Sequence, residues 1–234
     1  MFDLFSDAAK VAQQMEIICS EYGFALWETM YSLILEVLFS YVIGLPLGVL
    51  LVTGEKEGIR PLPRWLMAVL NAVINLLRSV PFLILMIIAL PLSKLIVGTK
   101  VGTAATIPPM VIAAFPLVAR MVESSLREVN QGVVEAAQSM GASALQIVGK
   151  VLLPEALPSL ISGGTITVGT ILGYGAMAGI IGGGGLGKIA INYGYYRFNV
   201  VLEFFATALL VVLVQILQTA GTRLAVKCDK RVQK

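Results

Sequence analysis

Two long segments without a charged side chain most constrain what this chain can fold into. Residues 157–181 and 204–222 are apolar and uncharged, and each is close to or above the ~20 residues that cross a bilayer as a helix. The whole chain agrees with them, since it is 57% hydrophobic and only 13% charged, whereas soluble domains are about 25% charged. Backbone polar groups in lipid must bond within their own segment or barrel. We therefore expect an all-α integral membrane protein.

Five membrane spans can be placed along the chain. They are expected at about residues 27–52, 65–93, 104–123, 157–181 and 204–222. The second span is compound, because its first half places Asn71, Asn75 and Arg78 on one helical face, either on the membrane surface or along a wet cavity. Its uncharged second half is too short to cross alone, so we expect the span to bend near Pro81.

The basic side chains predict the orientation of the spans. Most lysines and arginines lie in the loops after the first and third spans and in the C-terminal tail. By the positive-inside rule, the C-terminus is cytoplasmic and the N-terminus lies outside. The expected organisation is an extracytoplasmic or interfacial segment 1–25, a transmembrane domain 26–226 with a cytoplasmic loop at about 127–156, and a basic cytoplasmic tail 227–234. Segment 1–25 fits a short interfacial helix and a loose tail equally well.

Charged residues inside or near the spans are expected to be paired or to face the interior. Arg120, Glu123 and Arg127 are three and four positions apart, which places them side by side on one helix. Glu36 interrupts the first span, where a carboxylate is costly unless it faces the bundle interior. We expect Glu36 to be a structural residue that faces the interior, or else to lie nearer the membrane interface than this placement of the span suggests.

The glycine-rich stretch that contains Gly182, Gly187 and Lys188 resembles the start of a phosphate-binding loop, but the next residue is Ile189. Such a loop needs Ser or Thr there to hold Mg²⁺, and it needs a preceding strand rather than a membrane helix. We expect a flexible loop on the outer face. The chain also has no His and no recognisable nucleophile–base or metal constellation, so no catalytic or metal site is expected and a membrane enzyme is disfavoured.

The loop before the fourth span reads EAAQSMGASALQIVGKVLLPEALP. Residues 135–137 are expected to begin a short helix, Gly141 can end it in a left-handed conformation, and Ser143 can cap a second helix. Pro154 then sets the entry into the following span. Two short helices at an angle form an elbow suited to docking on a soluble partner, and an ordinary amphipathic loop is an equal alternative.

The same loop resembles the signature of bacterial ABC importer membrane subunits. The matching residues are Glu135, Ala136, Ala137, Gly141, Ala142, Leu153 and Pro154. The departure is Val151, where the family often has Ile, which is a mild change. The strings GLPLGVLL, RSVPFLILM, LVARMVESSL and GYGAMAGIIGGGGLG are similar to the membrane subunit of methionine importers in particular.

This resemblance implies a type I importer fold, a multi-pass location in the bacterial inner membrane and a homodimer. Two cytoplasmic ATPase subunits would dock on the loop and bind ATP and Mg²⁺ themselves, so this chain would hold no cofactor. An extracytoplasmic lipoprotein would deliver methionine to a pathway with alternating access. No nucleic acid is expected as a partner.

Tyr174 and Met177 are the candidate gate. They are the only large side chains in GYGAMAG, and their spacing places them on one helical face, either at the pathway or packed as core against the last span. Two other functions stay open. The subunit could import another amino acid or small polar solute, with D- versus L-methionine also open, or the chain could be an ion-coupled transporter that uses Glu36. An importer subunit requires an ATPase for transport, whereas an ion-coupled transporter does not, so dependence of transport on an ATPase distinguishes the two.

Overall fold

The computed structural model describes residues 8–229, and within this range every regular element is helical. The larger helices are α1 Ala8–Thr53, α2 Arg64–Ser79, α3 Phe82–Ile96, α4 Thr103–Arg127, α5 Gln131–Ser139, α7 Leu153–Ala178 and α9 Val200–Cys228. The shorter ones are α6 Ala144–Ile147, η2 Val148–Leu152, η3 Gly179–Ile181, α8 Gly185–Ile189 and η4 Ala190–Tyr195. The expected all-α class is confirmed. The parts of the expected terminal segments at residues 1–7 and 230–234 lie outside the described residues.

Four helical segments of the described chain are long and apolar enough to cross a membrane: Gln14–Thr53, Thr103–Arg127, Ala144–Ile181 and Val200–Cys228. They contain the first, third, fourth and fifth expected spans. The second expected span is α2 followed by α3, and the two are bent by 110° relative to each other. Pro81 is the N-cap residue of α3, and Val80 before it is extended, as the residue before a proline prefers. The predicted position of the bend is confirmed, and its angle is much sharper than that of a kinked span.

The segment before the first span is neither a separate interfacial helix nor a loose tail from residue 8 onward, because it is the first part of α1. The part of this segment around Tyr22 and Ala25 is held by tertiary contacts. The Tyr22 hydroxyl donates to the Leu202 carbonyl at 2.6 Å, and Tyr22 and Ala25 share a buried cluster with Leu186 and Ala206. These contacts attach α1 to α8 and α9.

The α1–α4 crossing depends on two glycines. A Cβ at Gly44 would lie 2.7 Å from the Val118 Cβ, and one at Gly48 would lie 2.6 Å from the Ala119 carbonyl oxygen. Both distances are shorter than ordinary carbon contacts of about 3.5–4.0 Å. The four-residue spacing of Gly44 and Gly48 therefore lets the two backbones approach closely, as small residues do between membrane helices.

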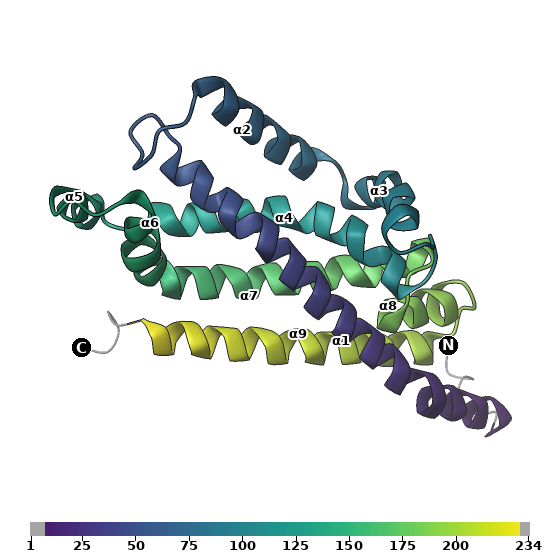
Figure 1. Ribbon diagram of the computed structural model, residues 1–234. Coiled ribbons are helices and arrows are strands. Elements are labelled where there is room, and N and C mark those ends of the chain that lie inside the picture. The colour runs from purple at the N-terminus through teal and green to yellow at the C-terminus, as the bar shows by residue number, and fades with distance from the viewer. Residues whose placement is uncertain (1–7, 230–234) are drawn as a thin grey trace.

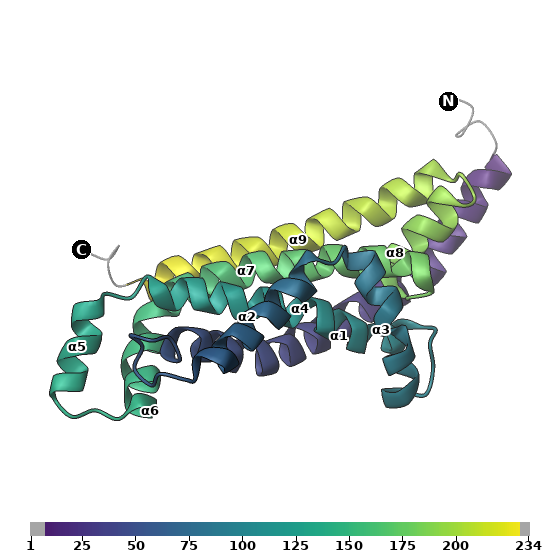
Figure 2. The same cartoon turned by 90° about the horizontal axis from the view of Figure 1, so that it is seen from above.

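The helices form one elongated bundle in which α4, α7 and α9 lie side by side and α1 crosses them (Figures 1 and 2). α5 and α6 gather at one end of the bundle, together with the C-terminal end of α9. α8 lies at the other end, beside the start of α1 (Figure 1). The bundle thus has an α5–α6 end and an α8 end, and the first and last described residues lie at opposite ends.

Candidate functional site

The loop that the sequence analysis expects on the cytoplasmic side forms a defined elbow, which we take as residues 131–152. The Asn130 side chain caps α5 by accepting a hydrogen bond from the Gly132 amide at 2.8 Å. α5 therefore begins at Gln131, and the expectation that Glu135 to Ala137 begin the helix is wrong, since they lie in its second half. Gly141 has φ +77°, as expected of a left-handed residue after a helix. Ser143 forms a reciprocal capping box with Gln146 at the start of α6, so that cap is also confirmed.

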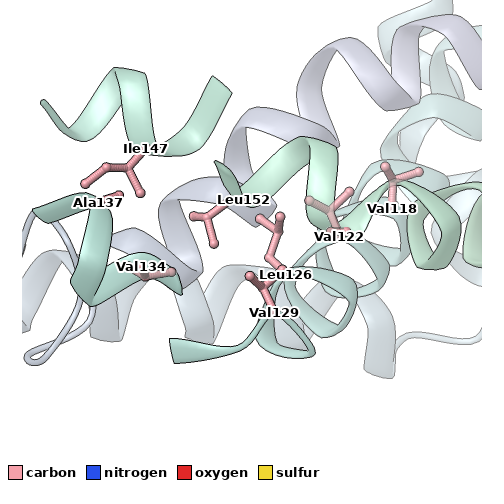
Figure 3. Packing of buried hydrophobic residues seen from close by; sticks show 9 residues of the cluster. Val118, Val122, Leu126, Val129, Val134, Ala137, Ile147 and Leu152 are labelled. Carbon is pink, nitrogen blue, oxygen red and sulfur yellow. The ribbon is translucent and has the colours of Figure 1, made fainter. Parts of the chain in front are cut away.

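The elbow shares a hydrophobic core with the membrane helices. Val134 and Ala137 of α5 and Ile147 of α6 point inward toward Leu126 of α4 and Leu152 of η2 (Figure 3). All five side chains are buried. Because this cluster continues along α4, movement of the elbow requires movement of α4 and α7 as well.

The opposite face of the elbow is exposed and partly apolar. Met140 is 82% exposed and Leu145 is 83% exposed, and they flank the turn at Gly141. Of the signature residues, Ala137 is buried, Ala142 and Leu153 are half-buried, and Glu135, Ala136, Gly141 and Pro154 are exposed. Two large apolar side chains are thus exposed at this turn. The small buried Ala137 lets α5 pack closely, while its exposed neighbours are free for a partner.

The elbow enters α7 without a break. η2, a short stretch of π-helix at Val148–Leu152, joins α6 directly to α7. Pro154 is the second residue of α7 and follows η2 directly. The sequence predicted the proline entry, but the wide turn of η2 was not anticipated.

A network of charges ties α4 to its neighbours beside the elbow. The buried Glu123 accepts from Arg120 at 2.5 Å and from Arg127 at 2.8 Å, so the predicted pairing is confirmed. Arg127 also pairs with Glu55 in the α1–α2 loop at 2.5 Å. Glu55 was missed because this contact joins positions 72 residues apart, which no local spacing reveals.

Arg120 also connects α4 to α2. Its Nη2 donates to Oδ1 of Asn71 and to Oδ1 of Asn75, both at 2.8 Å. The polar face of α2 thus lies toward α4 at these two residues, whereas the sequence left a membrane-surface and a wet-cavity position open. Arg78, the third residue of that face, is exposed.

The two candidate gate residues have different surroundings. The Tyr174 ring is half-buried and stacks on Phe82 of α3, with centroids 4.1 Å apart. Met177 is 46% exposed near the end of α7. Tyr174 is thus part of the packing between α7 and α3, and Met177 is the freer side chain of the two.

The glycine stretch is held in place at the α8 end of the bundle. Gly182 and Gly185 have positive φ angles of 87° and 76°. The Glu28 carboxylate accepts from the Gly185 amide at 2.9 Å and from the Thr103 hydroxyl at 2.6 Å. The expectation of a flexible loop is therefore wrong, because its backbone is bonded to α1. The Gly185 amide hydrogen points at a carboxylate of the chain itself, in place of a phosphate.

Glu36 faces the interior of the bundle and is 2% exposed, as expected. It borders a small cavity together with Ser32, Leu172 and Ala176. Among residues 8–229, no three His, Cys, Asp or Glu side chains gather as a metal site would require.

Comparison with known proteins shows which family this chain resembles in sequence and in fold. A family model described as "binding-protein-dependent transport system inner membrane component" matches residues 44–233. The probable D-methionine transport system permease protein of Vibrio cholerae is 50% identical, over 88% of this chain and 92% of that protein. The methionine import system permease protein of Bacillus subtilis is 47% identical, over 70% of this chain and 74% of that protein. A solved structure of the MetNI methionine ABC transporter, in an inward-facing conformation, aligns with a TM-score of 0.89 and 41% identity, and the match covers 92% of this chain and 99% of that one.

Proposed function

The chain belongs to the family of binding-protein-dependent transport system inner membrane components, and we propose that it is the membrane-spanning subunit of an ATP-driven methionine importer. It is a multi-pass protein of the bacterial inner membrane. The proposal of methionine as the substrate rests on the 50% identity to a relative named as a D-methionine permease, over most of both chains. The docking motif cannot name a substrate, because importers of different solutes share it.

The proposed topology has five spans, with α2 and α3 together forming the second. The elbow lies in the cytoplasm with the C-terminus, and the glycine stretch lies outside with the N-terminus. The distribution of lysine and arginine supports this orientation. So does the arrangement of the bundle, in which the C-terminal end of α9 lies at the α5–α6 end (Figure 1).

Two copies of the chain, related by a twofold axis, would enclose the translocation pathway, and each elbow would dock one cytoplasmic ATPase subunit. The exposed Met140 and Leu145, with Glu135 and Ala136 nearby, supply the docking face. ATP and Mg²⁺ belong to the ATPase subunits, and this chain takes no part in the covalent chemistry. An extracytoplasmic lipoprotein delivers the amino acid at the α8 end.

The shared core explains how ATPase movement reaches the pathway. Closure of the two ATPase subunits displaces the docked elbows. Because Ala137 and Ile147 pack against the same cluster as Leu126, the displacement is passed to α4 and α7. Interfaces packed in this way move as rigid bodies between two arrangements, which gives alternating access. Because the Arg127–Glu55 ion pair joins α4 to the α1–α2 loop, this loop would move together with α4.

Met177 is the proposed gate at the far end of α7, with Tyr174 holding the helix against α3 beside it. The unbranched thioether of Met177 adapts its shape to what it contacts, and it is exposed on its own chain, as a residue facing a second copy must be. Closing the pathway requires the same residue from both copies.

Uptake of labelled L- and D-methionine into proteoliposomes tests this function. The chain is reconstituted with its ATPase and binding protein, with or without enclosed ATP. We expect ATP-dependent uptake, and Leu145→Glu should abolish both uptake and co-purification of the ATPase. The matched control is Val101→Glu, another exposed aliphatic residue at the α8 end, which should retain the ATPase. Uptake without the ATPase, or an ATPase that still binds the Leu145→Glu variant, contradicts the proposal.

A further inference from the structure

A pocket at the α8 end of the bundle is bordered by side chains of both charge signs. Glu21 and Glu28 border it from α1, and Lys188 and Arg197 border it from α8 and from the turn after η4. Phe24 and Tyr193 complete the wall between them. The two sides of the pocket come from segments that are far apart in the sequence and that the tertiary fold brings together. The hydrogen bond between Tyr193 and Glu21, which are 172 positions apart, joins the two sides.

The two carboxylates are fixed in position by neutral donors. The Tyr193 hydroxyl donates to Oε1 of Glu21 at 2.7 Å, and this hydrogen bond raises the pKa of Tyr193. Glu28 is held by the Thr103 hydroxyl and the Gly185 amide. A carboxylate offers about four acceptor sites, so both groups keep capacity for further donors.

The two cations face the same pocket without neutralising these carboxylates. The Arg197 guanidinium lies over the Tyr193 ring, 4.7 Å from its centroid, which leaves its planar edge free. Lys188 is exposed in the last turn of α8. Among residues 8–229, no ion pair joins Lys188 or Arg197 to Glu21 or Glu28. Groups of both charge signs therefore border one cavity without forming an ion pair with each other.

Exposed aromatic residues surround the pocket. Phe24 is 65% exposed on its wall, and Trp27 follows one turn later on α1. Tyr195, Tyr196 and Phe198 are exposed beside Arg197. Aromatic side chains of this kind collect at the level of the lipid headgroups. A pocket at this level would be open both to water and to the polar part of the bilayer.

We propose that this pocket binds a zwitterion, with the ammonium group against Glu21 and Glu28 and the anionic group against Lys188 and Arg197. Two sources supply that chemistry: the headgroup of phosphatidylethanolamine and a free amino acid. A primary ammonium donates hydrogen bonds to the carboxylates, whereas the quaternary ammonium of phosphatidylcholine cannot. Phosphatidylglycerol has the phosphate without the ammonium. The inference does not rest on the proposed transport function, because it concerns equilibrium binding.

The test compares matched ligands on the purified full-length chain in detergent. Native mass spectrometry measures retention of phosphatidylethanolamine, phosphatidylcholine and phosphatidylglycerol with identical acyl chains. Equilibrium dialysis measures labelled methionine against N-acetylmethionine, which lacks the ammonium. In one of the two arms the zwitterion with a primary ammonium should bind about tenfold or more tightly than its matched compounds, as expected for hydrogen bonds between charged groups.

The variants Glu21→Gln and Lys188→Gln should each remove that preference. Lys56→Gln and Glu57→Gln make the same substitutions in the exposed α1–α2 loop and should keep it. A preference in the lipid arm identifies the headgroup as the source, and one in the dialysis arm identifies the amino acid. The proposal is overturned if the wild-type chain shows no preference in either arm, a comparison that needs no variant. It is also overturned if the preference survives both pocket substitutions.

Discussion

Adding one methyl group at the α1–α4 crossing should loosen the whole bundle. In the variant Gly48→Ala, the new Cβ would lie 2.6 Å from both the Ala119 carbonyl oxygen and the Val122 Cβ. Restoring ordinary contact distances of about 3.5–4.0 Å requires the helices to separate by roughly 1 Å. A gap of that size loses about a quarter to a half of the dispersion energy of each contact along the crossing. We expect a loss of about 1–3 kcal/mol in the free energy of unfolding, the usual cost of overpacking.

The control is Gly23→Ala in the same helix, where nothing lies within 4 Å of the added Cβ. Alanine is preferred over glycine inside a helix by about 0.5–1 kcal/mol, so this variant should be neutral or slightly stabilised. The double variant Gly44→Ala/Gly48→Ala gives a sharper check. One separation of α1 from α4 relieves both clashes, so its cost should be less than the sum of the two single costs.

Unfolding of the purified chain with increasing mole fraction of dodecyl sulfate in mixed micelles, followed by helical circular dichroism, measures these differences. If Gly48→Ala unfolds at the same detergent fraction as Gly23→Ala, the close α1–α4 approach is wrong. Full additivity in the double variant would show that the two clashes are relieved separately, which contradicts a rigid crossing.

Three further substitutions test other parts of the structure. Gly141→Ala forces alanine into a left-handed conformation with open space around it, so about 1–2 kcal/mol of backbone strain should speed hydrogen exchange in the elbow, whereas Gly149→Ala should not. Arg120→Gln removes charged hydrogen bonds to α2 and should cost about 1–3 kcal/mol in the same unfolding assay, and an unchanged midpoint would refute the connection. Met177→Ala should raise methionine leak through proteoliposomes that lack ATP, and unaltered leak and coupled uptake would remove Met177 from the gate.

The parts of the fold that depend on local chemistry could be predicted from the sequence. The left-handed Gly141, the Ser143 cap and the bend at Pro81 each depend on the conformational preferences of one or two residues. The pairing of Glu123 with its two arginines follows from the helical repeat. Such features are visible because cause and consequence lie within four positions.

What the sequence could not show depends on contacts between distant segments. The segment before the first span fits an interfacial helix and a loose tail equally well by its sequence, and from residue 8 it is part of α1, where Tyr22 and its neighbours pack on α8 and α9. The glycine stretch reads as flexible, and it is fixed because Glu28 reaches its backbone from 157 positions away. Asn130 lies outside the recognised motif, so the true start of α5 was missed although the capping residue was in view.

The unbroken passage from the elbow into α7 makes the helix a lever arm. α7 has 26 residues, so its two ends are about 39 Å apart at 1.5 Å per residue. A tilt of about 10° at the elbow would sweep the Met177 end through roughly 7 Å, which is more than one helical turn of about 5.4 Å. A hinge between the elbow and α7 would absorb that tilt. Because η2 continues the helix there, a small rotation imposed at the elbow by the proposed ATPase partner would become a displacement as wide as a side chain at the proposed gate.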